Sequence, residues 1–179
     1  MMSVLMLLIL LLVPQSGQQP SPVTTAKISS PEKALRFEVT VPAPIDAVWT
    51  AFTTTAGLKT WLWSDVNVDL REGGEWLVRF STASTGGGTI ESFNTQRRLV
   101  IKALAPEQFP TVRRERTTAT FEFAAVSPAS TRVTLTQTGW KTGKEWDDAY
   151  EYLAKGNASL MTQLHQRFVS GPIDWSKMK

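Results

Sequence analysis

The chain has 179 residues, a formal net charge of +3 and no cysteine. Its length predicts one domain that is large enough to bury an apolar core without covalent crosslinks. The lack of cysteine excludes disulfides, thiolate catalysis and cysteine-ligated metal sites, and the single histidine, His165, excludes a site with several histidine ligands. The basic residues form no patterned cluster, so nucleic acid is not expected as a partner.

The N-terminus carries an apolar run, Val4 to Val13, that ends at Pro14. A helix of that length rises about 15 Å, half of the ~30 Å hydrocarbon core of a bilayer, so the run is typical of a signal peptide rather than of a membrane span. We therefore expect residues 1–22 to direct export, which makes the protein secreted or periplasmic. The alternative is an uncleaved anchor that keeps the protein close to a membrane. Residues 23–33, which end a stretch rich in Pro, Ser and Gln, are predicted to be a flexible linker.

The first elements of the following domain are a strand and two short helices. Residues 35–41 alternate apolar and polar side chains, which predicts a strand with one buried face. Pro42 and Pro44 end it, and Pro44 suits the first turn of a helix. Apolar residues at helical spacing predict that helix over 45–52, and a second one is expected over 56–62.

A series of strands separated by turn signals follows, at residues 66–70, 76–80, 89–95, 99–104, 117–126 and 132–138. The glycine-rich Ser84–Gly88 is predicted to be a hairpin loop, and Arg113–Arg116 a solvated turn or strand end. Alternation places Phe121 and Phe123 on one buried face, and the same rule turns Gln137 inward.

The last element is a long amphipathic helix of about seven turns. Thr142 and Glu145 match a capping box, which predicts the start of the helix. Apolar residues then recur at helical spacing from Trp146 to Phe168, interrupted midway by Gly156 and Asn157. Residues 171–179 are predicted to be a C-terminal tail.

The order of elements predicts an α+β domain over residues 34–170. Strands joined by hairpins form antiparallel sheets, and a single long helix must then cover one face of the sheet. We expect a curved antiparallel sheet of about six or seven strands around the C-terminal helix, with two short helices after the first strand.

Three segments resemble a known family: "FEVTVPAPIDAVWTAFTTTAGLKTWL" (37–62), "VDLREGGEW" (68–76) and "TGWKTGKEWDDAYEYLAKGNASLMTQL" (138–164). Together they are similar to the heat-shock-protein ATPase activator (AHSA-like) branch of the START-like, or SRPBCC, superfamily. The resemblance implies a helix-grip fold with a deep cavity between sheet and helix. It also implies relatives that bind lipids, sterols, polyketides or other apolar ligands, some cyclases, and a co-chaperone that needs a second, N-terminal domain.

Large and polar side chains on the inner faces are the candidates for a ligand site. Aromatic rings supply rigid apolar walls, and a few amides in an apolar pocket would orient a ligand. The alternatives are that the rings only fill the core, and that the two amides bond each other or the backbone. The candidate cavity-lining residues are Trp76, Phe121, Phe123, Gln137, Trp140, Trp146, Tyr150 and Asn157.

Three functions remain open at this point. The first is non-enzymatic binding of an apolar, lipid-like or aromatic small molecule in an exported protein. The second is a protein-interaction module like the co-chaperone, and the third is a cyclase- or hydrolase-type enzyme that uses polar groups of the cavity. The sequence indicates no catalytic residues, metal or cofactor; Asp147, Asp148 and Glu151 fit a role at the positive start of the helix.

Overall fold

The computed structural model describes residues 21–177. In chain order the elements are β1 (Thr24–Ile28), β2 (Ala34–Val41), α1 (Ile45–Thr53), α2 (Thr55–Lys59), β3 (Val66–Val68), β4 (Glu75–Ser81), β5 (Ser84–Asn94), β6 (Arg98–Ala103), α3 (Pro110–Glu115), β7 (Thr117–Ser127), β8 (Ser130–Thr138), α4 (Lys144–Ser170) and a short 3-10 helix, η1 (Trp175–Lys177).

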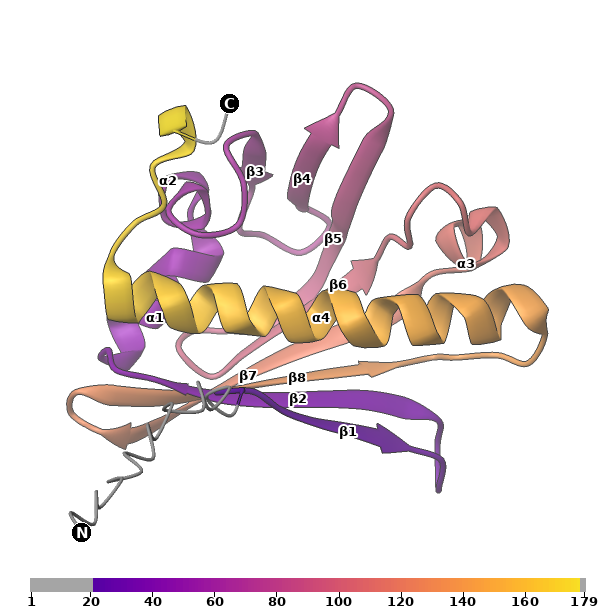
Figure 1. Ribbon diagram of the computed structural model, residues 1–179, viewed down its shortest axis with the longest axis horizontal. Helices are drawn as coiled ribbons and strands as arrows, with labels where there is room; N and C mark the ends of the chain where they lie inside the picture. The colour runs from indigo at the N-terminus through magenta and orange to yellow at the C-terminus, as the bar shows by residue number, and fades with distance from the viewer. Residues whose placement is uncertain (1–20, 178–179) are drawn as a thin grey trace, which may run out of the picture.

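The strands form one antiparallel sheet in the order β1-β2-β8-β7-β6-β5-β4-β3. Strands β3 to β8 lie side by side in chain order, with α3 inserted between β6 and β7, and β2 pairs with β8, with Leu35 opposite Gln137. Helix α4 lies across one face of this curved sheet (Figure 1). Helices α1 and α2 lie near the C-terminal end of α4, and α3 lies near the N-terminal end of α4. The expected helix-grip fold is confirmed, with eight strands rather than six or seven.

The core lies between α4 and the sheet because both present one apolar face. In β2 the buried Leu35, Phe37 and Val39 alternate with the outward Arg36 and Glu38. The buried residues of α4 fall on one side of the helix, at spacings of one, three, four or seven positions: Trp146, Ala149, Tyr150, Ala154, Met161 and Leu164.

The predicted linker contains a strand, so the prediction for this part of residues 23–33 is wrong. Strand β1 pairs with β2 along its whole length, from Thr24 opposite Glu38 to Ile28 opposite Ala34. Most of its side chains are exposed, so it lacks the apolar alternation by which strands are identified. Residues 1–20 of the predicted leader, which spans residues 1–22, lie outside the described residues.

Two further local predictions are wrong because contacts distant in sequence decide the conformation. Ser84–Gly88 is the start of β5, not a loop, and Gly87 has φ +89° where an added Cβ would lie 2.0 Å from the carbonyl oxygen of Trp76. The run Arg113–Arg116 lies in and just after α3, and the Arg113 side chain is only 23% exposed. Glycine is therefore needed at position 87 for the close approach of β5 to β4.

The segment after α4 packs against the domain rather than extending from it. The Ile173 N–H donates to the carbonyl oxygen of Thr60 (2.9 Å), and the Trp175 indole N–H donates to that of Lys59 (2.6 Å). The ring of Trp175 lies 5.4 Å from that of Trp63. Within residues 21–177, no helix is long and apolar enough to cross a membrane.

Candidate functional site

A cavity of about 430 Å³ lies between the middle of α4 and the sheet. Strands β4 to β8 supply one side, and Leu153, Gly156, Asn157 and Leu160 of α4 supply the other. Its volume falls within the usual range of small-molecule pockets. Most of the wall is apolar, through Trp76, Ile101, Phe121, Leu135, Leu153 and Leu160.

The rim of the cavity carries two exposed aromatic side chains. Phe80 of β4 and Tyr152 of α4 are each 47% exposed, and both line the cavity. Tyr152 packs edge-on against Phe109, which precedes α3, with the ring centroids 5.5 Å apart. Exposed rings beside an apolar hollow provide contact area for an apolar molecule that enters it.

The two amides predicted from the sequence meet in the cavity wall. The Gln137 amide donates to the Thr117 hydroxyl (2.7 Å), and its carbonyl oxygen accepts from the Asn157 amide (2.7 Å). Gln137 is only 3% exposed, so these bonds satisfy a group whose burial would otherwise be costly. The alternative that the two amides bond each other is therefore confirmed, and both also line the cavity.

Gly156 is a solvent-exposed residue of α4 that lines the cavity, and it leaves that part of the helix without a side chain. A Cβ added to it would meet no atom within 4 Å, so no close packing requires a glycine here. A glycine in a helix interior costs about 1 kcal/mol relative to alanine. No contact of α4 offsets this loss of helix stability, and Gly156 lines the cavity.

Four of the six predicted aromatic residues do not line the cavity. Trp140, Trp146 and Tyr150 are buried and pack edge-on, with Trp140 5.0 Å from Tyr150 and 6.5 Å from Trp146. Phe123 packs against Trp49 and Phe52 at 5.3 and 5.1 Å. The packing alternative is therefore correct for these four residues, because they lie at the two ends of the core rather than in its middle. Trp76 and Phe121 do line the cavity, as predicted.

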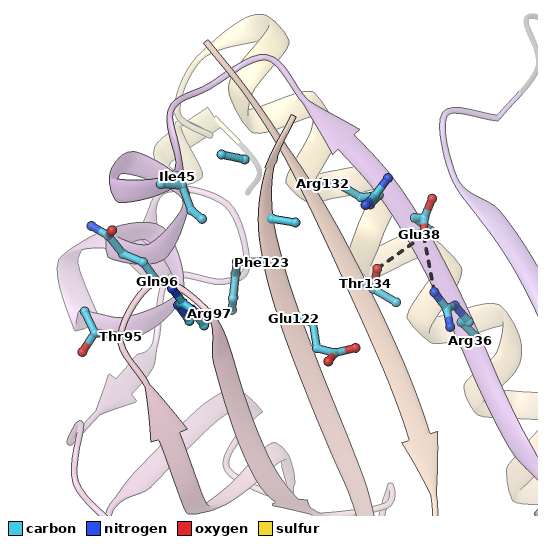
Figure 2. A pocket seen from close by; sticks show the side chains of 12 residues that line it. Arg36, Glu38, Ile45, Thr95, Gln96, Arg97, Glu122, Phe123, Arg132 and Thr134 are labelled. Atoms are coloured by element: carbon cyan, nitrogen blue, oxygen red, sulfur yellow. Dashed lines mark hydrogen bonds and ion pairs between the residues drawn. The ribbon is translucent and has the colours of Figure 1, made fainter. Parts of the chain in front are cut away.

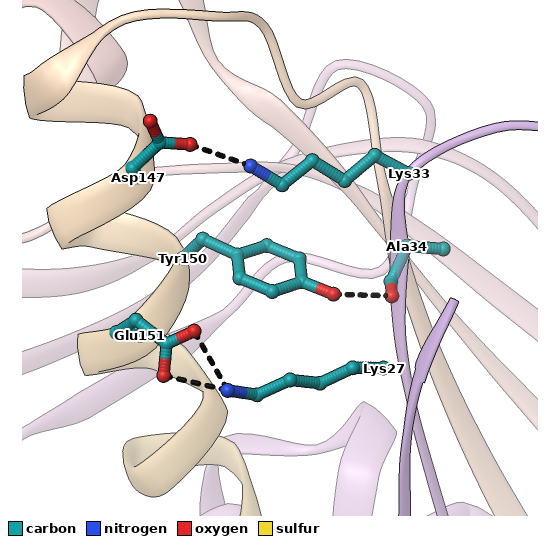
Figure 3. A network of polar contacts seen from close by, with 6 residues as sticks. All are labelled: Lys27, Lys33, Ala34, Asp147, Tyr150 and Glu151. Atoms are coloured by element: carbon teal, nitrogen blue, oxygen red, sulfur yellow. Dashed lines mark hydrogen bonds and ion pairs between the residues drawn. The ribbon is translucent and has the colours of Figure 1, made fainter. Parts of the chain in front are cut away.

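Tyr150 also joins α4 to the N-terminal strands (Figure 3). Its hydroxyl donates to the carbonyl oxygen of Ala34 (2.9 Å), and burial raises its pKa. Lys33 and Lys27 lie over its ring at 4.6 and 5.9 Å, and each reaches an acidic residue of α4. These two ion pairs are Lys33–Asp147 (2.7 Å) and Lys27–Glu151 (2.6 Å). We name these five side chains the Tyr150 clasp.

A polar network that the sequence did not reveal spans the rim. The Glu107 carboxylate accepts from the Thr85 N–H (2.7 Å) and pairs with Arg113 (3.1 Å). Arg113 also donates to the carbonyl oxygens of Thr85 (2.9 Å) and Ala105. The Thr85 N–H, with a smaller contribution from Arg113, lowers the pKa of Glu107. The network ties the start of β5 to the loop before α3.

Glu145 holds α3 in place instead of capping α4. Its carboxylate accepts from the backbone N–H groups of Thr111 and Val112, at 2.6 and 3.1 Å. The N-cap of α4 is Gly143, with no side-chain hydrogen bond, so the predicted capping box is wrong. Burial raises the pKa of Glu145, but the two hydrogen bonds outweigh it and the pKa lies below its ordinary value.

The acidic residues of early α4 do not gather into a reactive site. Asp147 and Glu151 pair with lysines of the Tyr150 clasp, and Asp148 pairs with Lys144 (2.6 Å). His165 lies outside the cavity. Within the described part of the chain, no group of three or more acidic, histidine or cysteine side chains is placed to hold a metal ion.

A larger hollow of about 870 Å³ lies on the face of the sheet turned away from α4 (Figure 2). Charged and polar side chains form most of it, among them Arg97, Glu122 and Arg132. Glu38 bonds to Arg36 (3.6 Å) and Thr134 (3.4 Å) within it. It is open and mostly polar, so the smaller, apolar cavity is the better candidate for a ligand site.

Comparison with known proteins places this chain in a family. The model of the Activator of Hsp90 ATPase homolog 1-like protein family matches residues 42–168. No curated protein sequence matches the chain closely enough to count as a relative.

Three solved structures illustrate the shared fold. The Aha1 dimer from Colwellia psychrerythraea has a TM-score of 0.63 and 17% identity, and the match covers 77% of this chain and 97% of that chain. CalU16 from Micromonospora echinospora has a TM-score of 0.59 and 19% identity, covering 87% and 86%. DynU16, a protein of the dynemicin biosynthetic locus, has a TM-score of 0.60 and 16% identity, covering 78% and 48%.

The family model spans most of the chain, from the end of β2 to the last turns of α4. The chain therefore belongs to the family of Activator of Hsp90 ATPase homolog 1-like proteins, within the START-like superfamily.

Proposed function

We propose that the protein binds an apolar small molecule, without transforming it, in the cavity between α4 and the sheet. The observation that carries this proposal is the opening at Gly156. A glycine that weakens the longest helix, and that no close neighbour requires, is accounted for if its missing side chain leaves room for a ligand.

The composition of the wall supports binding rather than catalysis. A proton-transfer site needs ionisable groups within reach of the reacting atoms. Among the described residues that line the cavity, only Glu107 and Tyr152 are ionisable, and both belong to the rim. The Glu107 carboxylate is already engaged by Thr85 and Arg113.

A protein-interaction module would need no cavity, because its contacts lie on the surface. Such a protein would have a filled core and an exposed apolar patch. Here the core is interrupted by about 430 Å³ of open space, and two of the most exposed aromatic side chains lie beside that space. The cavity therefore favours ligand binding over the co-chaperone role.

We also propose that the ligand is met outside the cytoplasm. The support is the apolar run from Val4 to Val13, whose length suits a signal peptide. The first described strand, β1, begins at Thr24, so removal of residues 1–22 leaves each described strand intact.

The binding proposal is tested with 1-N-phenylnaphthylamine, an uncharged dye whose fluorescence rises in apolar surroundings. We expect saturable binding to the wild type and a loss of at least about tenfold in affinity for Gly156→Leu, equivalent to ~1.4 kcal/mol. The variant should remain folded, because leucine is a better helix former than glycine.

The matched control is Lys155→Leu, which adds a leucine one position earlier on α4. Lys155 is exposed and does not line the cavity. Its variant should bind the dye as the wild type does. Absence of saturable binding to the wild type, or equal binding by the wild type and Gly156→Leu, would contradict the proposal.

A further inference from the structure

The described lining of the cavity carries almost no formal charge. Among the described residues that line it, Glu107 is the only one with a formal charge, and none is a lysine, arginine or histidine. The nearest guanidinium of the rim network belongs to Arg113, which is held by the carbonyl oxygens of Thr85 and Ala105 and by Glu107. Among the described residues, the lining of the cavity therefore offers a ligand no free cation.

This lack of a cation determines which ligands can enter. A carboxylate, sulfonate or phosphate that leaves water for an apolar wall needs a positive partner, because burial of an unpaired charge is strongly unfavourable. At the rim such a group would also meet the Glu107 carboxylate, whose lowered pKa keeps it ionised at neutral pH. Anionic lipids and fatty acids are thus poorly matched to this site.

The cavity does offer one neutral polar group. Asn157 uses one amide N–H to bond Gln137, and no other hydrogen bond of its side chain is found within residues 21–177. Its carbonyl oxygen and its second N–H remain available to a ligand. Gln137 is fixed on both sides by Thr117 and Asn157, so it orients Asn157 rather than serving the ligand itself.

We propose that the ligand of this cavity is an uncharged apolar molecule with a single hydroxyl or carbonyl group that bonds Asn157, and that anionic analogues are excluded. This inference rests on the proposed binding function and names its ligand class. Asn157 then sets the orientation of the ligand, and the missing cation sets its charge.

A matched pair of dyes tests the exclusion of anions on the wild-type protein. 1-Anilinonaphthalene-8-sulfonate has the ring system of 1-N-phenylnaphthylamine plus one sulfonate. At pH 7 we expect the sulfonate to bind the cavity at least about tenfold more weakly than the uncharged dye. If the sulfonate binds the wild type and Gly156→Leu equally well, it binds the outer surface of the protein. That outcome also supports its exclusion from the cavity.

A variant with an added positive charge at the rim tests whether the sulfonate is excluded by its charge or by its size. Gln108 lines the cavity and is exposed, so Gln108→Lys places an ammonium at the mouth without disturbing the core. This variant should bind the sulfonate several-fold more tightly and the uncharged dye within about twofold of the wild type. If it binds the sulfonate no better, charge is not the reason for the exclusion and the inference is overturned.

The results distinguish the two proposals. If neither dye shows saturable binding, the proposed function fails. If both dyes bind with equal affinity and Gly156→Leu weakens both, the protein binds apolar molecules but the inference about charge is overturned.

A second pair of competitors tests Asn157. 2-Naphthol and 2-methylnaphthalene have nearly the same shape, and only the first can hydrogen-bond. In the wild type we expect 2-naphthol to displace 1-N-phenylnaphthylamine at equal or lower concentration, although it is the less apolar of the two. Asn157→Leu should reverse this preference, with a change of about tenfold in the ratio of the two affinities. A wild-type preference for 2-methylnaphthalene would overturn the role of Asn157 whether or not the variant folds.

Discussion

Gly156 and Gly57 are both helical glycines, but their surroundings differ. In α4 an added Cβ at Gly156 would meet nothing within 4 Å, whereas at Gly57 in α2 it would lie 2.1 Å from the carbonyl oxygen of Thr50. Gly57 is therefore required for packing of α2 on α1. Gly156 has no such requirement, which is why we attribute it to the cavity.

Replacing the two glycines with alanine should change the free energy of unfolding in opposite directions. Gly156→Ala should raise the free energy of unfolding by about 0.5–1 kcal/mol, because alanine is the better helix former and has room. Gly57→Ala should lower it, because backbone atoms must move to admit the methyl group. Urea denaturation of both variants measures the two changes. A loss of stability in Gly156→Ala would mean that the glycine serves the packing of α4.

The amide pair shows how far single residues could be predicted. Strand alternation turned Gln137 inward, and helical spacing put Asn157 on the same side of α4, so a contact between them was a sound expectation. The cavity positions of Trp76 and Phe121 followed in the same way. Periodicity identifies the inner face, but it does not tell which part of that face meets another side chain and which meets open space. Trp140, Trp146, Tyr150 and Phe123 were misplaced for that reason.

At the scale of elements, α3 depends on a residue far from it in sequence. Glu145 of α4 accepts from the first backbone N–H groups of α3, those of Thr111 and Val112. These N–H groups have no partner inside a helix, so a carboxylate from outside stabilises them. Helix α3 could not be predicted from its own six residues, because its stabilising partner lies in α4. Strand β1 is a similar case, since its partner is β2 and its own side chains are mostly exposed.

The dependence of α3 on Glu145 should vary with pH. The pKa of Glu145 is lowered in the folded protein, so its carboxylate stabilises the fold above the unfolded pKa, about 4.3 for glutamate, and this contribution is lost as the pH falls through the folded pKa. We expect Glu145→Gln to lower the urea midpoint at pH 7 and to differ progressively less from the wild type below pH ~4.

Asp148→Asn is the control for this experiment. Asp148 lies on the same helix, but within residues 21–177 its side chain pairs only with the exposed side chain of Lys144. Its variant should change the midpoint little at any pH, as is usual for an exposed ion pair. A Glu145→Gln deficit that stays constant from pH 7 to pH 3 would contradict the role of the ionised carboxylate.

For the whole molecule, most elements between residues 35 and 168 were predicted, apart from α3 and the start of β5, whereas the ordered segments at both ends were not. The alternating strand at residues 35–41, the strands of the sheet and the long helix have strong periodic signals, and the structure contains all of them. The segments before and after them are polar and short. Contacts with other elements hold these segments in place. Lys27 belongs to the Tyr150 clasp, and Trp175 contacts Lys59 and Trp63.

The export proposal predicts where the mature chain begins. We expect N-terminal sequencing of the protein from its own compartment to give a start between about Ser16 and Val23, since the apolar run ends at Pro14 and β1 begins at Thr24. An intact Met1 in a soluble cytosolic fraction would contradict export. As a control, a chain that starts at Val23 should melt as the mature protein does, and one that starts at Pro31 should melt lower because it lacks β1 and Lys27.

The pairing of β2 with β8 has a consequence for the time at which the chain folds. Val41 lies opposite Thr131, 90 residues later, and α4 follows β8 in the sequence. Contacts between segments so distant form slowly, because a long loop must close first. A growing chain emerges at about 5–20 residues per second, so β2 waits several seconds for its partner. During that interval the N-terminal half cannot complete its core, and a transport channel that accepts only unfolded chains would find it still unfolded.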